Sequence, residues 1–202
     1  QCQLSIPTHP SGQPFCEKRR KLKTPWCAAV LNLILATALT SGAASCPQQV
    51  VDQLDGLYQW HLTAQSNQQR GDLTLQKQAF TPELYEQLSR AWALDPWVDG
   101  AFLDFVVFSG TQVTTFGADV IGCQKLYPKG NAFYPEVIAA NVAVRVGLRG
   151  RASEVPQQLS YLLIRSDNEW MISDLIYNHQ TGVSSSLSEL LRSILSSAAI
   201  PR

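Results

Sequence analysis

Four titratable side chains lie in or beside apolar stretches of the sequence, where a carboxylate or an imidazole could act as a general base. They are Asp104, Asp174, His61 and His179. A general base works best when an apolar environment shifts its proton affinity toward neutral pH. Asp104 interrupts the apolar run 101–108, so we expect its carboxyl group to be buried, which favours the protonated form.

Each of these residues also has a structural interpretation. Asp104 could cap a backbone turn, and Asp174 could be a hydrogen-bonded residue at the end of a strand. His61 falls on the apolar face of an expected helix, where a hydrogen-bonded core histidine is the usual finding. His179 follows in a polar loop and is expected to be exposed.

Aromatic side chains could line a pocket for an apolar ligand. The predicted ligand-binding residues are Tyr58, His61, Trp92, Trp170 and Tyr177. Trp60 and Trp97 are further aromatic candidates. At these spacings, aromatic residues more often belong to an ordinary hydrophobic core.

The sequence contains no Ser-His-Asp arrangement, no glycine-rich phosphate loop and no Cys/His spacing typical of a metal site. We therefore predict neither a cofactor nor a metal. Arg145, Arg149 and Arg151 form a loose basic set that is either solvated or a docking patch for a partner.

Charge is distributed unevenly along the 202 residues, although the formal net charge is zero. A basic cluster occupies residues 18–23, whereas from Cys46 onward 11 Lys and Arg residues face 15 Asp and Glu residues, a net charge of −4. A mildly acidic body does not attract nucleic acid over long range. The apolar content of 45% is enough for a folded core and argues against disorder.

The order of residues before Cys46 indicates a secretory signal peptide. The basic cluster precedes an apolar run of about 14 residues from Trp26 to Leu39, and small residues follow at 40–45. The run is shorter than the ~20 residues that span a bilayer. We predict a leader over 1–45, a single domain over 46–202, and export to the periplasm or the outer face of a bacterial membrane. Because no Met opens the chain, residues 1–17 are interpreted as mis-joined upstream sequence, or the chain as a fragment.

Two cysteines follow the predicted leader, and two fates are open to them. In an oxidising compartment Cys46 and Cys123 could form a disulfide. Cys46 also comes directly after small residues, as in a lipoprotein signal, although Ala43 stands where Leu is usual. Acylation of Cys46 would leave Cys123 as a lone thiol.

Three helices are expected from apolar periodicity and end signals. The first runs from Gln48 to about Gln69, with Gly71 suited to its C-terminal cap. The second begins at Thr81-Pro82-Glu83 and ends at Asp95-Pro96. The last follows Ser186, which forms a Ser-x-x-Glu capping box with Glu189.

The strands are expected between the second and third helices. Residues 101–108 could be a short helix or a buried strand, and 109–135 are predicted to be irregular with one short strand near 111–116. Residues 136–149 alternate as a strand with Ile138 to Leu148 inward at even positions. A hairpin over 161–177 turns at 166–169 and places Trp170, Ile172 and Ile176 on one face. Segregated helices and consecutive antiparallel strands predict an α+β fold with helices packed on one face of a curved sheet.

The helix pair, the long strand and the final hairpin resemble the nuclear-transport-factor-2-like superfamily. In that family the final hairpin commonly reads aromatic-x-Ile-x-Asp-Ile, and Trp170, Ile172, Asp174 and Ile176 match this pattern. Residues 48–195 are also similar to secreted bacterial proteins of unknown function, in which a Leu-Asp-x-Asp-Pro-Phe-like stretch is common. Here Leu103 and Asp104 keep the start of that stretch, but Val106 and Val107 replace its Asp-Pro.

The resemblance implies a cone-shaped domain whose open end lies between sheet and helices, where some relatives bind apolar ligands and some isomerise or hydrate them. Three hypotheses follow. The favoured one is a non-catalytic envelope domain that binds a small apolar ligand or a protein partner. The others are an isomerase or dehydratase with Asp104 or Asp174 as base, and a structural homodimer that pairs through the outer sheet face.

Overall fold

The computed structural model describes residues 45–126, 135–178 and 184–198. All of these residues belong to a single compact unit of the chain. The predicted leader, apart from Ser45, and His179 lie outside the described residues. None of the described helices is both long and apolar enough to span a bilayer.

The first helix, α1, spans Gln48–Ser66 and buries Val50, Leu54, Leu57 and Tyr58 along the predicted stripe. It ends earlier than predicted, with Asn67 as its C-cap and Gln68 at a positive φ of 54°. The predicted cap at Gly71 is wrong. Gly71 instead lets the chain pass against the Trp60 ring, because a Cβ at Gly71 would collide with the indole.

The second helix, α2, spans Pro82–Trp92 and begins as predicted, since the Thr81 hydroxyl accepts a hydrogen bond of 3.3 Å from the Leu84 N–H. It ends three residues before the predicted stop at Asp95. A short 3-10 helix, η1 (Leu73–Ala79), precedes it and was not predicted. The Asp72 carboxylate caps η1 by accepting from both the backbone and the hydroxyl of Thr74.

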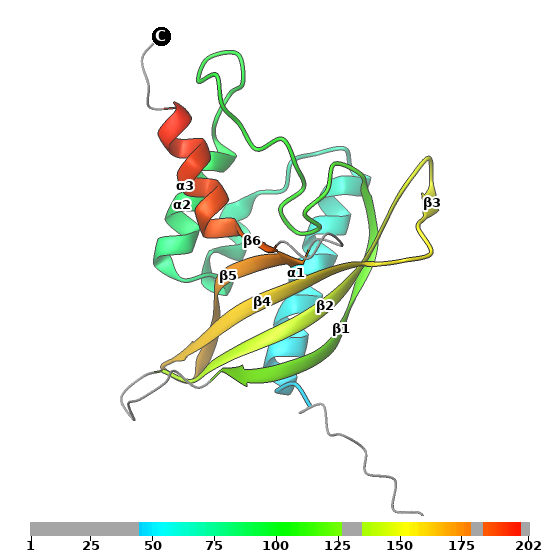
Figure 1. The fold of residues 1–202 in the computed structure, drawn as a ribbon, viewed down its shortest axis with the longest axis vertical. Coiled ribbons are helices and arrows are strands. Elements are labelled where there is room, and N and C mark those ends of the chain that lie inside the picture. The colour runs from blue at the N-terminus through cyan, green and yellow to red at the C-terminus, as the bar shows by residue number, and fades with distance from the viewer. Residues whose placement is uncertain (1–44, 127–134, 179–183, 199–202) are drawn as a thin grey trace, which may run out of the picture. The chain divides into compact units, whose positions relative to one another are not determined.

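The six strands form an open antiparallel sheet. Figure 1 shows how the sheet lies against the helices. The order of the strands is β1-β2-β4-β5-β6, and the short β3 pairs with β2. Their bounds are β1 Thr114–Leu126, β2 Val137–Leu148, β3 Arg151–Ala152, β4 Gln157–Ser166, β5 Glu169–Asn178 and β6 Ser184–Ser186. The α+β class and the antiparallel arrangement are therefore confirmed.

The prediction for the segment before β2 is wrong, because β1 has 13 residues rather than a short strand near 111–116. Its pairing with β2 shifts register twice, between Thr115 and Gly117 and between Val120 and Gly122. Each shift inserts a residue that breaks the inward-outward alternation of side chains. Because alternation is broken twice and Gly follows each inserted residue, the sequence of β1 resembles that of a loop, which explains the wrong prediction.

The alternation predicted for β2 holds from Ile138 to Val146, but Leu148 is 65% exposed where the strand leaves the sheet. The hairpin of β4 and β5 turns at Asp167 and Asn168, whose φ values of 50° and 68° suit a tight hairpin turn. Leu159, Tyr161 and Leu163 of β4 are buried on the inner face of the sheet.

One bulge in β5 overturns the predicted facing of its second half. Leu162 pairs with Asp174 and Leu163 with Ile172, so Ser173 is the extra residue. Trp170 and Ile172 are buried as predicted, but beyond the bulge Leu175 and Tyr177 point inward. The prediction that Ile176 shares the face of Trp170 is therefore wrong.

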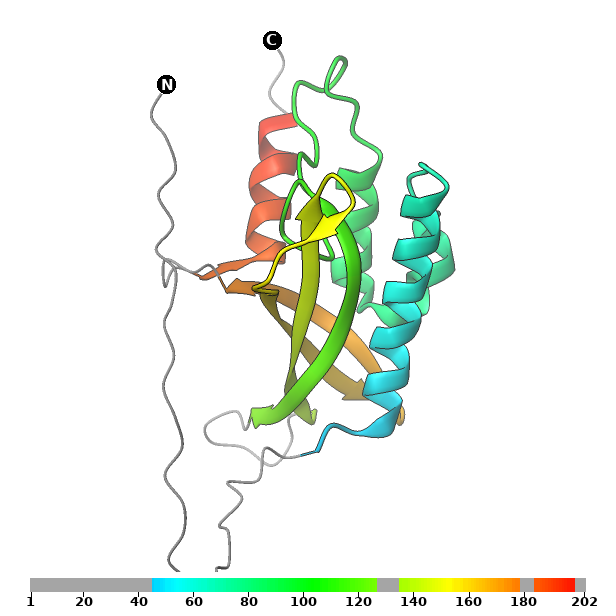
Figure 2. The same cartoon turned by 90° about the vertical axis from the view of Figure 1, so that its right-hand side faces the viewer.

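The last helix, α3, spans Leu187–Ala198 and buries Leu187 and Leu191. Its predicted cap is present, since the Ser186 hydroxyl accepts a bond of 3.4 Å from the Glu189 N–H. The helices α1 and α2 lie along one side of the sheet in Figure 2, and α3 packs on α2 and β5. The core therefore lies between this helical layer and the inner face of the sheet.

The segment that joins α2 to β1 is neither the helix nor the buried strand expected for 101–108. It turns back on itself, with a hydrogen bond of 2.7 Å from the Val106 N–H to the Thr111 carbonyl. Val107, Phe108 and Ser109 are buried at this turn. We call residues 103–108 the inner segment, because it inserts between the helices and the sheet.

Candidate functional site

A cavity of about 260 Å³ opens between α1, the C-terminal end of α2 and the inner segment. Trp60, His61 and Ala64 line it from α1, and Trp92 lines it from α2. The inner segment contributes Leu103, Phe105, Val106, Val107 and Phe108. We call this space the aromatic pocket.

Phe108 is the centre of the aromatic cluster behind the aromatic pocket. Its ring centroid lies 5.7 Å from that of Trp60, 6.4 Å from that of Trp92 and 5.5 Å from that of His61. The Trp60 pair is close to edge-on, at an interplanar angle of 82°, which is a favourable geometry for aromatic rings. This cluster fixes the ring orientations that give the pocket its wall.

Three buried tyrosines hold the inner segment from behind. The Tyr58 hydroxyl donates to the Phe108 carbonyl at 2.9 Å, and the Tyr177 hydroxyl donates to the Val107 carbonyl at 2.9 Å. The Tyr161 hydroxyl donates to the Tyr58 oxygen at 2.9 Å. The two carbonyls are thereby satisfied away from the pocket, so the inner segment presents mainly apolar side chains to it.

Burial raises the pKa of all three tyrosine hydroxyl groups above the usual 10.0, because a phenolate would lose its hydration. They therefore stay protonated and act as hydrogen-bond donors rather than as bases at neutral pH.

The polar side chains of α1 that line the aromatic pocket are already engaged with β1. Gln65 bonds the Thr115 backbone twice, accepting from its N–H at 3.0 Å and donating to its carbonyl at 2.8 Å. His61 Nε2 lies 3.2 Å from the Thr115 hydroxyl oxygen. Burial lowers the pKa of His61 below its usual 6.5, so the ring is neutral at pH 7.

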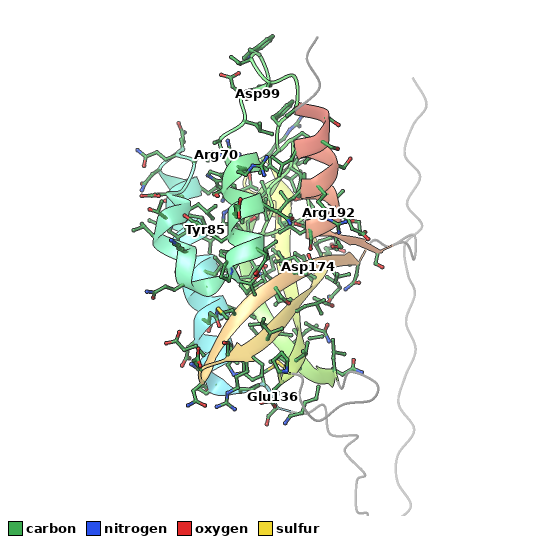
Figure 3. The ribbon with its side chains drawn as sticks, turned by 90° about the vertical axis from the view of Figure 1, so that its left-hand side faces the viewer. Arg70, Tyr85, Asp99, Glu136, Asp174 and Arg192 are labelled. Carbon is green, nitrogen blue, oxygen red and sulfur yellow. A yellow bond between two sulfur atoms is a disulfide. The ribbon has the colours of Figure 1, made fainter. Side chains whose placement is uncertain are left out.

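Arg70 provides the positive charge at the edge of the aromatic pocket. Its guanidinium carbon lies 4.4 Å from the centroid of the Trp92 ring, a cation–π distance. Figure 3 places Arg70 beside the C-terminal end of α2. Loss of hydration at this contact lowers the pKa of Arg70 from its usual value, although the guanidinium remains charged at neutral pH.

A second cavity, of about 420 Å³, lies between the inner segment and α3. Asp104, Tyr177, Leu190 and Ile194 are among the residues that line it. Asp104 is exposed, so its expected burial is wrong. It therefore lacks the apolar surroundings that the enzyme hypothesis requires of a base.

Asp174 has the structural role that was the alternative to catalysis. Its carboxylate accepts hydrogen bonds from the Ser186 hydroxyl at 2.6 Å, the Ser188 N–H at 3.1 Å and the Leu175 N–H at 2.8 Å. Figure 3 shows Asp174 next to the first turn of α3. The bulge at Ser173 turns it away from the inner face, so it lines neither cavity.

The predicted ligand-binding residues are divided among several places. His61 and Trp92 line the aromatic pocket, and Tyr177 lines the second cavity. Tyr58 lines a third hollow, of about 360 Å³, together with the ion pair of Arg145 and Asp119.

Trp170 is buried in the core beside Arg165, with 5.9 Å between guanidinium carbon and ring centroid. Trp97 is 94% exposed at the tip of the segment after α2. Neither residue therefore lines the aromatic pocket. Arg149 and Arg151, from the basic set with Arg145, are exposed as expected for solvated residues.

Sequence reasoning missed Arg70 and the apolar residues of the inner segment that line the aromatic pocket. Arg70 is a charged residue in a polar stretch, which typically predicts a solvated side chain. Leu103, Phe105 and Phe108 have no helical or strand period around them, and only their apolar character indicated burial. The run of Leu, Phe, Val and Phe itself was the available signal for a buried wall.

Cys46 and Cys123 form a disulfide, with 4.9 Å between their Cα atoms. It joins Cys46, two residues before α1, to the edge strand β1. Within the described ranges, no group of three or more His, Cys, Asp and Glu side chains could hold a metal ion.

The outer face of the sheet carries apolar rows across neighbouring strands. Val137, Ile164 and Met171 form one row, and Ala139 and Leu162 belong to the next. All are half-buried except Ala139, which is 9% exposed. In Figure 2, α1 and α2 lie on the opposite side of the sheet.

Comparisons with protein-family models, with curated proteins and with solved structures found no match to this chain.

Proposed function

We propose that this chain is an exported envelope domain that binds a small apolar ligand in the aromatic pocket. The observation that carries the proposal is the cavity of about 260 Å³ with Trp60, Trp92, Leu103 and Phe105 in its lining. Concave sites with mostly apolar walls and few polar groups are the usual form of small-molecule sites. The cavity volume suits a ligand of about one or two rings.

The pocket wall is pre-formed, which favours binding over catalysis. The tyrosine hydrogen bonds hold Val107 and Phe108 in place without a ligand. A pre-formed wall needs little ordering on binding, so more of the contact energy appears as affinity. The pocket also lacks a buried carboxylate in its described lining, so the isomerase or dehydratase alternative has less support.

Export is supported by two independent features. The basic, apolar and small-residue order of 18–45 is that of a signal peptide. The disulfide between Cys46 and Cys123 suits an oxidising compartment such as the periplasm. The same disulfide disfavours acylation of Cys46, because one sulfur cannot hold both a thioether and a disulfide.

The cone shape of the nuclear-transport-factor-2-like superfamily belongs to the same proposal. The helices on one side of a bent antiparallel sheet, with the pocket between them, are what that resemblance implies. The inner segment would then close the mouth of the cone, leaving the aromatic pocket as its remaining space.

Indole titrations, followed by calorimetry, test ligand binding. Ala64 lines the pocket and Thr63 is the exposed neighbour on the same helix, so Ala64→Leu fills the pocket and Thr63→Leu is its matched control. We expect the wild type and Thr63→Leu to bind indole and Ala64→Leu to bind at least about ten-fold more weakly. Equal affinity in all three proteins would place binding elsewhere, and no binding in the wild type would refute the proposal.

Homodimer formation is a second candidate, favoured by the apolar rows on the outer sheet face. Leu162 lies in the middle of these rows, between Ala139 and Asp174. We expect light scattering of the wild type to give a dimer and Leu162→Lys a monomer, because an unpaired charge in an apolar interface is unfavourable. A monomeric wild type at high concentration would refute this candidate.

A further inference from the structure

The aromatic pocket combines an apolar body with one exposed cationic side chain, Arg70, and this combination indicates a ligand class. This inference rests on the function proposed above and names the chemistry of its ligand. Arg70 is the charged residue among those that line the pocket in the described chain. A lone cation beside aromatic walls selects for a complementary negative charge on an apolar molecule.

Other acidic side chains do not neutralise Arg70. The ion pairs among the described residues join Lys125 and Arg165 to Glu136, and Arg145 to Asp119. Asp72 is the carboxylate nearest to Arg70 in sequence, and it accepts hydrogen bonds from the backbone N–H and the hydroxyl of Thr74 at the start of η1. The guanidinium therefore lies over the Trp92 ring without a carboxylate partner in the described part of the chain.

The position of the guanidinium over the Trp92 ring leaves it available for a planar anion. A guanidinium on an aromatic face keeps its N–H groups at the edge of the stack, directed away from the ring. Two of those N–H groups match the two oxygens of a carboxylate in parallel hydrogen bonds. Stacking also limits the rotamers of a long side chain, so less freedom is lost when the anion binds.

Most other polar groups of the wall are already engaged, whereas the exposed Gln69 lines the pocket next to Arg70 in sequence. Gln65 is held by two bonds to Thr115. The carbonyls of Val106, Val107 and Phe108 accept bonds from Ser109 and Gly110, from Tyr177 and from Tyr58 respectively. The ligand's body therefore meets apolar surface, and its charge meets Arg70.

A single cation suits a monoanion better than a dianion. A phosphate monoester carries about two negative charges at pH 7, and one guanidinium leaves the second charge unpaired. The body of the domain has a net charge of −4, which opposes a dianion further. We propose that the aromatic pocket binds a small organic acid, with a flat apolar body between Trp60 and the inner segment and its carboxylate on Arg70.

Three probes of similar size test this assignment by calorimetry at low salt. They are phenylacetate, its neutral isostere phenylacetamide, and phenyl phosphate. We expect phenylacetate to bind the wild type at least about ten-fold more tightly than phenylacetamide, because a charge-assisted pair is lost in the amide. We expect phenyl phosphate to bind more weakly than phenylacetate.

Arg70→Gln removes the cation, and Arg151→Gln removes an exposed arginine from the β2–β4 connection as its charge-matched control. In Arg70→Gln the ratio of the affinity for phenylacetate to that for phenylacetamide should fall to about one. Phenylacetamide should bind as before, which also shows that the pocket is intact. Arg151→Gln should keep the wild-type ratio. Arg70→Lys should give an intermediate ratio, because an ammonium supplies charge without the planar pair of donors.

Several outcomes would overturn the assignment. If phenylacetate and phenylacetamide bind the wild type equally, the pocket binds apolar molecules without selecting acids, and only this inference fails. If phenylacetate is still preferred in Arg70→Gln, another group selects the acid and the assignment of the carboxylate to Arg70 fails. Tighter binding of phenyl phosphate than of phenylacetate would mean that the pocket prefers a phosphate to a carboxylate, which would also overturn the assignment. If none of the probes binds, the proposed function fails as well.

Discussion

Hydroxyl groups behind the aromatic pocket control its shape at the residue scale. The carbonyls of Val107 and Phe108 point into the core and each accepts a bond from a buried tyrosine. A buried carbonyl without a partner is unfavourable, so these two bonds determine which side of the inner segment faces the cavity. The residues that shape the site are thus remote from the ligand.

Tyr58→Phe tests this arrangement, because it removes the bond to Phe108 and also leaves the Tyr161 hydroxyl without its acceptor. We expect the free energy of unfolding, measured by urea denaturation, to fall by about 1–3 kcal/mol. Tyr85→Phe is the matched control, since Tyr85 is half-buried and its ring contacts Lys77 instead. An unchanged midpoint for Tyr58→Phe would mean that the buried bonds do not stabilise the segment.

The same tyrosines predict a loss of stability at alkaline pH. Their pKa values are raised in the folded state, so below pH ~10 both states are protonated and the stabilisation is complete. Above pH ~10 the unfolded chain releases these protons while the folded chain keeps them. The free energy of unfolding should then fall by about 1.4 kcal/mol per pH unit for each buried tyrosine.

The ionisation of the tyrosines and the unfolding of the protein can be followed together during an alkaline titration. Tyrosinate absorbance measures the first, and far-ultraviolet circular dichroism measures the second. We expect the phenolate signal of the buried tyrosines to rise only as the helical signal is lost. Full ionisation near pH 10 in a protein that keeps its native dichroism would contradict their burial.

At the scale of the element, periodicity predicted the helices and failed wherever the chain departs from its period. The stripe of α1 and the cap of α2 follow local rules, and both were predicted from sequence. No local sequence pattern indicates the bulge at Ser173. This bulge alone moves both Asp174 and Ile176 to the opposite face of the sheet from the one that strict alternation gives them. A strand predicted with a strict two-residue period therefore places both residues on the wrong face.

The candidate site was predicted in part for the same reason. His61 and Trp92 lie on regular helices, so their inward direction followed from spacing. The inner segment follows no period, and its path depends on bonds from Tyr58 and Tyr177, which are 50 and 70 residues away. Contacts across such separations depend on the tertiary fold and cannot be obtained from a local pattern.

Asp174 links two elements, because its carboxylate on β5 accepts bonds from the first turn of α3. A carboxylate at a helix N-terminus satisfies free N–H groups and interacts favourably with the helix dipole. We expect Asp174→Ala to lower the free energy of unfolding by about 1–2 kcal/mol. Because Asp104 is exposed, Asp104→Ala should change the free energy of unfolding by less than about 0.5 kcal/mol.

Hydrogen exchange of the α3 amides is the second measurement for Asp174. We expect faster exchange in the first turn of α3 for Asp174→Ala and no change for Asp104→Ala. Equal stability and exchange in the two variants would remove the capping role, and the catalytic interpretation of Asp174 would regain support.

At the scale of the whole molecule, the disulfide joins the start of the helical layer to the free edge of the sheet. Its two cysteines are 77 residues apart, and β1 is the outermost strand beside α1. The contacts of α1 with β1 are also where His61 and Gln65 bond Thr115. The disulfide therefore reinforces the edge that supports one wall of the aromatic pocket.

Reduction of this disulfide should weaken the whole domain. Closing a loop of this length restricts the unfolded chain, which corresponds to about 4 kcal/mol of stabilisation in the chain-entropy account. We expect the thermal midpoint of the oxidised protein to fall on reduction to that of the Cys46→Ser/Cys123→Ser variant, which a reductant should leave unchanged. The intact mass of protein purified from its own envelope reports whether the disulfide forms there. We expect this mass to be lower than that of the reduced chain by two hydrogen atoms. An acylated Cys46, or a midpoint insensitive to reduction, would contradict a structural disulfide and favour the membrane-anchored alternative.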